Sequence, residues 1–247
     1  MTDDPWLVRL NQVNKALTTL VCFPHAGGSA SYFHPLASRL GGEVEVLAVQ
    51  YPGRQERRHE PLIGTIKGLV EEISPRLAGL TESPVALFGH SMGATVAFEV
   101  TREMEAARTS GPTVLFLSGR RAPSCAALSA TRPPTDHELL DEIARLDGTQ
   151  SEFLRDKELL AMVLPALRAD YKALAAHRAD PWARVRAAIT ALGGDADPMV
   201  DADGLDAWKM HTESSFTRHS LPGGHFYLNA HVSAVADVVR ERLRRDV

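Results

Sequence analysis

Short apolar runs alternate with amphipathic segments along much of the chain. Each apolar run is followed by turn residues, which is typical of strands buried on both faces of a parallel sheet. The predicted strands are residues 19–23, 44–49, 85–88, 113–118 and 188–192. The predicted helices are 32–40, 64–80, 94–107 and a terminal helix at about 230–244. This alternation predicts an α/β fold with a mainly parallel central sheet flanked by helices.

Residues 120–184 break this rhythm, because the segment has helical patterns and no good strand. One apolar face runs from Leu139 to Leu146, and another runs from Leu160 to Leu174 at spacings of four and three. Pro165 lies inside the second pattern and is expected to begin or kink a helix. A helical block between two strands favours a lid over the carboxyl edge of the sheet, where α/β folds bind ligands. Ordinary crossover helices packed on the sheet are the alternative.

Composition excludes several classes of protein. The 247 residues carry 27 basic and 31 acidic side chains, a net charge of −4, so no positive field exists to hold a nucleic acid. No apolar run approaches the roughly 20 residues that a membrane span needs, and the acidic N-terminus does not resemble a signal peptide. Two cysteines suit a reducing cytoplasm. We expect one cytoplasmic, monomeric domain, 1–247, with a helical lid insertion at 120–184.

A candidate nucleophile lies where the third predicted strand meets a predicted helix. Residues 89–93 read Gly-His-Ser-Met-Gly, a G-x-S-x-G motif in the strand-to-helix context that it requires. Glycines at both ends allow the tight turn that raises Ser91 above the sheet. The N–H of Met92 would then point to the place where an oxyanion forms. A glycine-rich turn with a capping serine is the structural alternative.

The serine needs a base, and in this motif context the acid and the histidine follow it along the chain. Asp197 comes directly after the strand at 188–192, and we prefer it to Asp195 as the acid. His225 lies in a glycine-rich loop before the terminal helix and is the candidate base. Either aspartate could instead bond only its own turn.

The remaining histidines do not suggest catalysis or a metal site. His90 lies inside the turn and is expected to be structural, while His211 and His219 are expected on the surface of a helix and a strand. The chain has no zinc-site spacing such as H-E-x-x-H, so we expect no metal.

The first predicted strand is followed by Pro-His-Ala-Gly-Gly-Ser at 24–29, which resembles part of an oxyanion hole. The N–H of Ala26 would be the second donor, beside that of Met92. A nucleotide-binding loop is excluded because G-x-G-x-x-G and a Walker lysine are missing. A simple tight turn remains the alternative.

Two basic stretches follow strand ends and are expected on the rim of the site. Arg54 belongs to the first and Arg120 to the second. Arginines there could contact an anionic substrate arm or an acidic partner protein, or they could be solvated loop residues.

Several segments together resemble the type II thioesterases, stand-alone α/β-hydrolases of polyketide and non-ribosomal peptide synthesis. Besides the serine motif, the matching segments are Phe-Pro-His-Ala-Gly-Gly at 23–28, Tyr-Pro-Gly-Arg at 51–54, Ser-Gly-Arg at 118–120, Leu-Pro-Ala-Leu-Arg-Ala-Asp at 164–170 and Pro-Gly-Gly-His-Phe at 222–226. They span nearly the whole chain. Residues 132–151 match least.

The resemblance implies hydrolysis of acyl groups from the phosphopantetheine arm of acyl or peptidyl carrier proteins, clearing stalled or wrong units from the synthase. The substrate carries phosphopantetheine, so the protein needs no cofactor of its own. Ser91, Asp197 and His225 would form the triad. The residues expected to contact substrate are His25, Gly27, Arg54, Arg120 and Phe226.

Three other functions stay open. A general esterase or lipase would share the triad and differ only in the lid and rim. An acyltransferase or cyclase would pass the acyl group to another nucleophile. A non-catalytic binding protein of the same fold would be expected to lack a triad residue, whereas all three are present here.

Overall fold

A computed structural model describes residues 4–80, 82–109, 111–128, 134–147 and 157–245. The strands are β1 (Leu7–Arg9), β2 (Thr18–Phe23), β3 (Val44–Val49), β4 (Val85–His90), β5 (Val114–Ser118), β6 (Ala188–Gly194) and β7 (Phe216–Leu221). The α-helices are α1 (His34–Leu40), α2 (Ile66–Ala78), α3 (Met92–Ala106), α4 (Asp136–Asp147), α5 (Lys157–Ala176), α6 (Ala202–Asp206), α7 (Tyr227–Ala230) and α8 (Val232–Arg245). Short 3₁₀ turns are η1 (Ala30–Phe33), η2 (Gln55–Arg57), η3 (Pro123–Leu128) and η6 (Ala207–His211).

The strands form a seven-stranded sheet in the order β1-β3-β2-β4-β5-β6-β7. β1 is antiparallel to β3, and every other pair is parallel. The α/β fold with a mainly parallel sheet is therefore confirmed. β1 was not expected, because three residues are too few to show a pattern.

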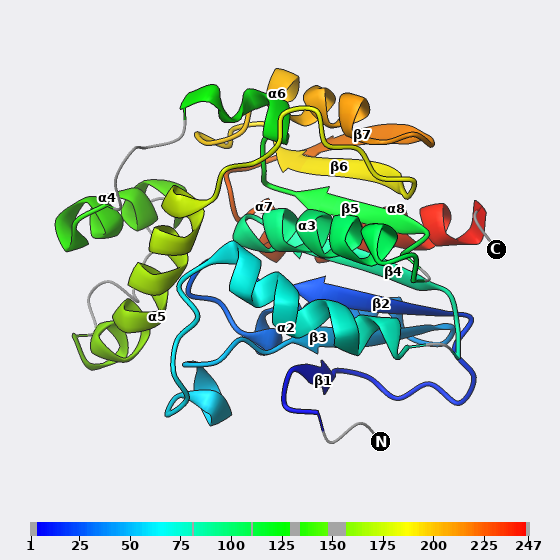
Figure 1. Ribbon diagram of the computed structural model, residues 1–247, viewed down its shortest axis with the longest axis horizontal. Coiled ribbons are helices and arrows are strands. Elements are labelled where there is room, and N and C mark those ends of the chain that lie inside the picture. The colour runs from blue at the N-terminus through cyan, green and yellow to red at the C-terminus, as the bar shows by residue number, and fades with distance from the viewer. Residues whose placement is uncertain (1–3, 81, 110, 129–133, 148–156, 246–247) are drawn as a thin grey trace.

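Helices cover both faces of the sheet (Figure 1). α2 and α3 pack together over one face, and α1 and α8 pack together over the other. Each face has its own apolar core: Leu87 and Phe98 belong to the first, and Phe88 and Phe116 to the second. Alternate residues of β4 thus enter opposite cores, which explains why this strand is apolar without interruption.

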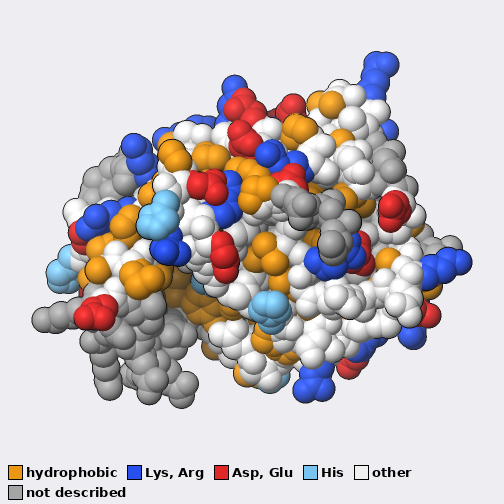
Figure 2. Space-filling view, turned by 90° about the horizontal axis from the view of Figure 1, so that it is seen from below, with side chains coloured by type: hydrophobic (Ala, Val, Ile, Leu, Met, Phe, Trp, Pro, Cys, Tyr) orange, Lys and Arg blue, Asp and Glu red, His pale blue; other side chains and the backbone are white. Residues whose placement is uncertain are grey.

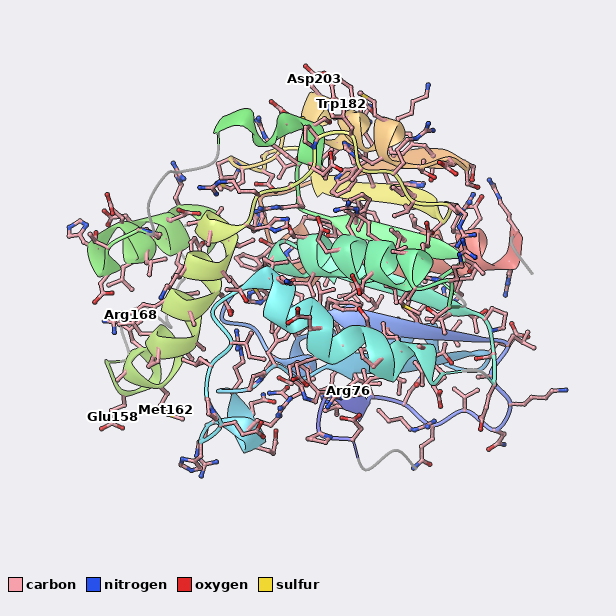
Figure 3. All side chains as sticks on the ribbon, in the orientation of Figure 1. Arg76, Glu158, Met162, Arg168, Trp182 and Asp203 are labelled. Carbon is pink, nitrogen blue, oxygen red and sulfur yellow. The ribbon has the colours of Figure 1, made fainter. Side chains whose placement is uncertain are left out.

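The described helices of the 120–184 segment, α4 and α5, lie beyond the ends to which the parallel strands point (Figure 1). Figure 3 shows Arg168 on the side of α5 that faces away from the sheet, and Glu158 and Met162 at the N-terminal end of the helix. Arg168 pairs with Asp136 and so links α5 to α4.

α5 does not begin at Pro165 but continues through it. The proline is exposed, so water can bond the carbonyl group that loses its helical partner. The expected terminal helix at about 230–244 corresponds to α8, and the short helix α7 precedes it.

Candidate active site

Ser91 occupies a strained turn between β4 and α3, as the motif predicts. Its backbone has φ 56° and ψ −116°, and its N–H donates to the Ser118 carbonyl at 2.8 Å. A side chain at Gly93 would overlap the Phe23 carbonyl, and one at Gly89 would overlap the first turn of α3. The two glycines therefore permit β2, β4 and α3 to meet at the serine.

Ser91, His225 and Asp197 form a continuous hydrogen-bonded chain. The Ser91 hydroxyl lies 2.9 Å from Nε2 of His225, and Nδ1 of His225 lies 2.8 Å from the Asp197 carboxylate. The other carboxylate oxygen of Asp197 accepts the Met199 N–H at 2.8 Å. His225 and Asp197 are buried, at 3% and 9% exposed, so water competes little for these bonds.

Asp195, the alternative acid, does not contact the histidine. It is exposed and accepts the Gly223 N–H at 2.9 Å, which holds the loop that precedes His225. The two aspartates therefore have separate positions: Asp197 against the imidazole and Asp195 against its loop.

A buried polar network behind His225 was not evident from the sequence. Nδ1 of His90 lies 2.8 Å from the Ser118 hydroxyl, which lies 2.7 Å from the Tyr227 hydroxyl. The ring centroids of His90 and His225 are 5.3 Å apart. Burial lowers the pKa of His90 well below its usual value, with a smaller effect of His225, so a neutral ring faces the catalytic candidate. The sequence signal for this network was the polar character of His90, Ser118 and Tyr227, which lie at strand and loop ends.

The loop after β2 is tied to the helical segment by one carboxylate. Asp170 of α5 accepts the Gly27 N–H at 2.7 Å and also pairs with the Arg54 guanidinium. Gly27 has φ +73°, and a side chain there would press on Leu167 of α5. Burial raises the pKa of Asp170, while Arg54 and the Gly27 N–H favour its charged form.

Arg54 was expected on the rim of the site, where it could contact an anionic group or be solvated, but it is not a solvated loop residue. Its side chain is buried, with the guanidinium also donating to the Pro52 carbonyl at 2.7 Å. It cannot reach a carrier protein while it is paired in this way. The buried carboxylate of Asp170, on α5, holds the Arg54 side chain inside the protein.

His25 and Phe226, two expected substrate contacts, lie together beside the triad. Their ring centroids are 5.0 Å apart, and Phe226 is 5.3 Å from His225. Nδ1 of His25 donates to the Ala26 carbonyl at 2.9 Å. Burial lowers the pKa of His25 to about 4, so the ring is neutral at pH 7. Gly27 lies in the same loop as His25, and its N–H donates to the Asp170 carboxylate.

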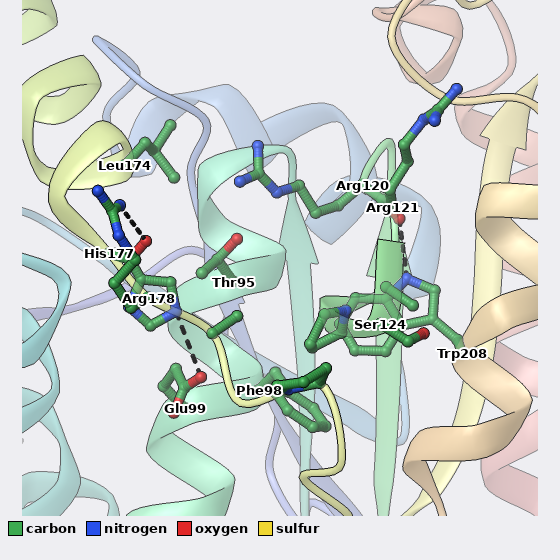
Figure 4. Close-up of a pocket in the computed structure, with 14 residues that line it drawn as sticks. Thr95, Phe98, Glu99, Arg120, Arg121, Ser124, Leu174, His177, Arg178 and Trp208 are labelled. Carbon is green, nitrogen blue, oxygen red and sulfur yellow. Dashed lines mark hydrogen bonds and ion pairs between the residues drawn. The ribbon is translucent and has the colours of Figure 1, made fainter. Parts of the chain in front are cut away.

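Arg120 follows β5 and is half-buried, so it is not a solvated rim residue. It lines a pocket between α3 and α5 (Figure 4). The neighbouring Arg121 is exposed and donates to the Met199 carbonyl and to Asp201, both at 2.9 Å.

His211 was expected on the surface but is fully buried. Its Nδ1 donates to the Ala183 carbonyl at 2.6 Å, and its Nε2 lies 2.9 Å from the Ser124 hydroxyl. It joins the start of β6 to the loop after β5, and so it has a structural position.

Within the described ranges, no three His, Cys, Asp or Glu side chains are grouped as metal ligands would be. No helix in the same part of the chain has both the length and the apolar character to cross a membrane. Basic and acidic side chains are interspersed on the face shown in Figure 2.

Replacing Arg54 by Met should destabilise the protein by about 3–5 kcal/mol, because Asp170 would remain buried without its cation. Urea denaturation measures this loss. Arg58→Met is the matched control, since Arg58 lies four residues away and is exposed. Equal, small losses in both variants would contradict a buried ion pair.

Stability should fall as the pH decreases from about 6.5 towards 4. Burial lowers the pKa values of His25, His90 and His211, so these rings stay neutral in the folded protein while they bind protons in the unfolded chain. Urea denaturation between pH 7 and 5 should show this slope, and His25→Gln should reduce it. His137→Gln, an exposed control, should leave the slope unchanged.

Comparison with known proteins agrees with this geometry. The probable cadicidin biosynthesis thioesterase of Streptomyces griseus is 39% identical, over 98% of this chain and 66% of that protein, so the chain spans slightly less than two thirds of that relative. Thioesterase PikA5 of Streptomyces venezuelae is 41% identical, over 98% of this chain and 89% of that protein.

Among solved structures, the type II thioesterase BorB from the borrelidin biosynthetic cluster is similar with a TM-score of 0.89. It is 43% identical, and the match covers 98% of this chain and 99% of that one. The family model for the thioesterase domain matches residues 18–243. The chain therefore belongs to the thioesterase domain family.

Proposed function

We propose that this protein is a serine thioesterase that hydrolyses acyl groups from the phosphopantetheine arm of acyl or peptidyl carrier proteins. The observation that carries the proposal is the hydrogen-bonded chain from Ser91 through His225 to Asp197, in a member of the thioesterase family. Its role would be to remove stalled or wrongly loaded units from a polyketide or non-ribosomal peptide synthase. The relatives named for such pathways support this role.

In the first half-reaction, Nε2 of His225 takes the proton of the Ser91 hydroxyl as its oxygen attacks the thioester carbonyl. Asp197 holds the imidazole with Nδ1 protonated and stabilises the imidazolium that forms. The tetrahedral intermediate collapses, the carbon–sulfur bond breaks, and His225 protonates the leaving thiolate. Ser91 is left as an acyl ester.

We assign the oxyanion hole to the N–H groups of Met92 and Ala26. Met92 is the first residue of α3, where the backbone N–H has no partner within the helix. The close approach of Gly93 to the Phe23 carbonyl brings the loop that carries Ala26 next to this helix end. Each donor of this kind is worth about 2.7–4 kcal/mol in the transition state.

In the second half-reaction, His225 takes a proton from water, which attacks the acyl ester and releases the free acid. The same oxyanion donors serve again. This step needs no group beyond water and the triad, and the phosphopantetheine belongs to the substrate.

The helical segment at 120–184 would act as the lid of this site. α5 supports this proposal because it contacts the loop of Gly27 through Leu167 and Asp170. His25 and Phe226 would form the wall of the site next to His225. The two cysteines are free thiols, which fits a cytoplasmic enzyme.

The direct test is hydrolysis of an acyl-phosphopantetheinyl carrier protein, followed by intact mass. The wild-type protein should release the acyl group, and Ser91→Ala should leave it in place because no nucleophile remains. Carrier thioesters that stay intact while simple esters are cleaved would reject the role in carrier editing.

Asp197→Asn should lower kcat about 10³- to 10⁴-fold, because the amide no longer holds the correct tautomer of His225. Steady-state hydrolysis of a thioester measures the effect. Asp195→Asn is the matched control and should stay within about threefold of wild type, since an amide oxygen can still accept the Gly223 N–H. Similar losses in both variants would contradict the assignment of Asp197.

A further inference from the structure

A pocket of about 380 Å³ lies between α3, the C-terminal half of α5 and the loop that follows β5. Its lining is mixed: Phe98, Leu174 and Trp208 supply apolar surface, and charged and polar side chains supply the rest. Figure 4 shows the Arg120 side chain extending across this space toward α5. The pocket does not include a triad residue, and the mechanism above does not use it.

The pocket lies beside α3, the helix that begins directly after the nucleophile. Thr95 and Phe98 line it, and they follow Ser91 by four and seven residues. Thr95 and Phe98 lie on one face of α3, one and two turns beyond the N-cap position that Ser91 occupies. Thr95 is one turn from the nucleophile, which corresponds to a rise of about 6 Å.

Residues of α5 and residues at the end of β5 also lie both near the triad and at the pocket. On α5, Leu167 contacts the loop at Gly27, and Leu174, seven residues later on the same face, lines the pocket. At the end of β5, a side chain at Gly119 would lie 3.3 Å from the His225 ring, and Arg120 is the next residue. Three elements that reach the triad or its loops therefore also line this pocket.

Arg120 supplies a positive charge that has no ion-pair partner within the described residues. After burial, the groups that act on its pKa are Tyr171 and then Glu142, whose carboxylate accepts the Tyr171 hydroxyl at 3.2 Å; neither forms an ion pair with Arg120. Burial lowers the pKa of Arg120, which shows that its surroundings solvate the guanidinium poorly. A half-buried guanidinium beside an apolar wall favours an anionic ligand with an apolar body.

The other charged side chains of the pocket are paired or, like Arg178, exposed to solvent. Glu99 lies 3.4 Å from His177 and 2.8 Å from Arg102, and these groups hold its pKa below the usual value despite burial. Arg178 donates to the carbonyl groups of Ala175 and His177. Arg120 thus differs from Arg178 in being half-buried without an ion-pair partner among the described residues, so it is the positive charge that a ligand inside the pocket would meet.

We infer that this pocket is the distal acyl subsite and that Arg120 makes it selective for acyl chains that end in a carboxylate. The inference rests on the proposed function and specifies its substrate class. An acyl group on Ser91 would extend along α3, with its methylene groups against Phe98 and Leu174 and its terminal carboxylate on the guanidinium. The substrate would be the half-thioester of a dicarboxylic acid, and the group on Ser91 would be its half-ester.

The test compares N-acetylcysteamine thioesters of glutaric acid and pentanoic acid, which have equal chain length and differ in the terminal carboxylate. The wild-type protein should have the higher kcat/KM for the glutaryl thioester. Arg120→Met should reduce the glutaryl value about 10- to 100-fold and leave the pentanoyl value within about threefold. Arg120→Lys should restore part of the preference.

Arg121→Met is the matched control, since Arg121 is adjacent but is bonded to Asp201, and it should leave the preference unchanged. Binding of the glutaryl thioester to Ser91→Ala, measured by calorimetry, should weaken when Arg120→Met is added. This second measurement does not depend on turnover.

Equal losses for both thioesters in Arg120→Met would overturn the inference, because Arg120 would then position α5 or His225 and not the ligand. An unchanged preference in that variant would also overturn it. Failure of the wild-type protein to hydrolyse either thioester faster than Ser91→Ala does would count against the proposed function itself.

Discussion

Backbone contact at the serine turn is the constraint on which the rest of the structure depends. The ends of β2 and β4 and the first turn of α3 approach so closely that Gly89 and Gly93 have no space for a side chain. This contact fixes Ser91 in a conformation that non-glycine residues rarely adopt. The strained conformation of Ser91 is maintained because its relaxation would disturb the sheet and the apolar cores on the two faces of the sheet.

The partners of the serine come from elements distant in the chain but adjacent in the sheet. β5 receives the N–H of Ser91, β6 ends just before Asp197, and β7 leads into the loop of His225. Because these strands are parallel neighbours, their carboxyl ends lie at one edge. The geometry of the site is thus a consequence of strand order, and the loops only complete it.

The sequence predicted those features that local patterns express. Strands buried on both faces appear as apolar runs, and the nucleophile, acid and histidine follow strand ends in a known order. β7 alternates between partly buried and exposed residues and therefore shows no such run. Arg54 and His211 were misplaced because their partners, Asp170 and Ala183, lie far along the chain, and no local pattern reveals a contact of that kind.

The double contact of Asp170 has a consequence for motion. Its carboxylate bonds both the loop of Gly27 and the side chain of Arg54, so α5 cannot withdraw at this point without breaking both bonds in the same event. With the proposed roles of α5 as lid and of this loop as an oxyanion donor, opening of the lid and rearrangement of the loop would be thermodynamically linked. A state with an open lid and an intact loop would require α5 to pivot about Asp170. Solvent access and catalytic competence would then vary together, through a single carboxylate that takes no part in the proposed chemistry.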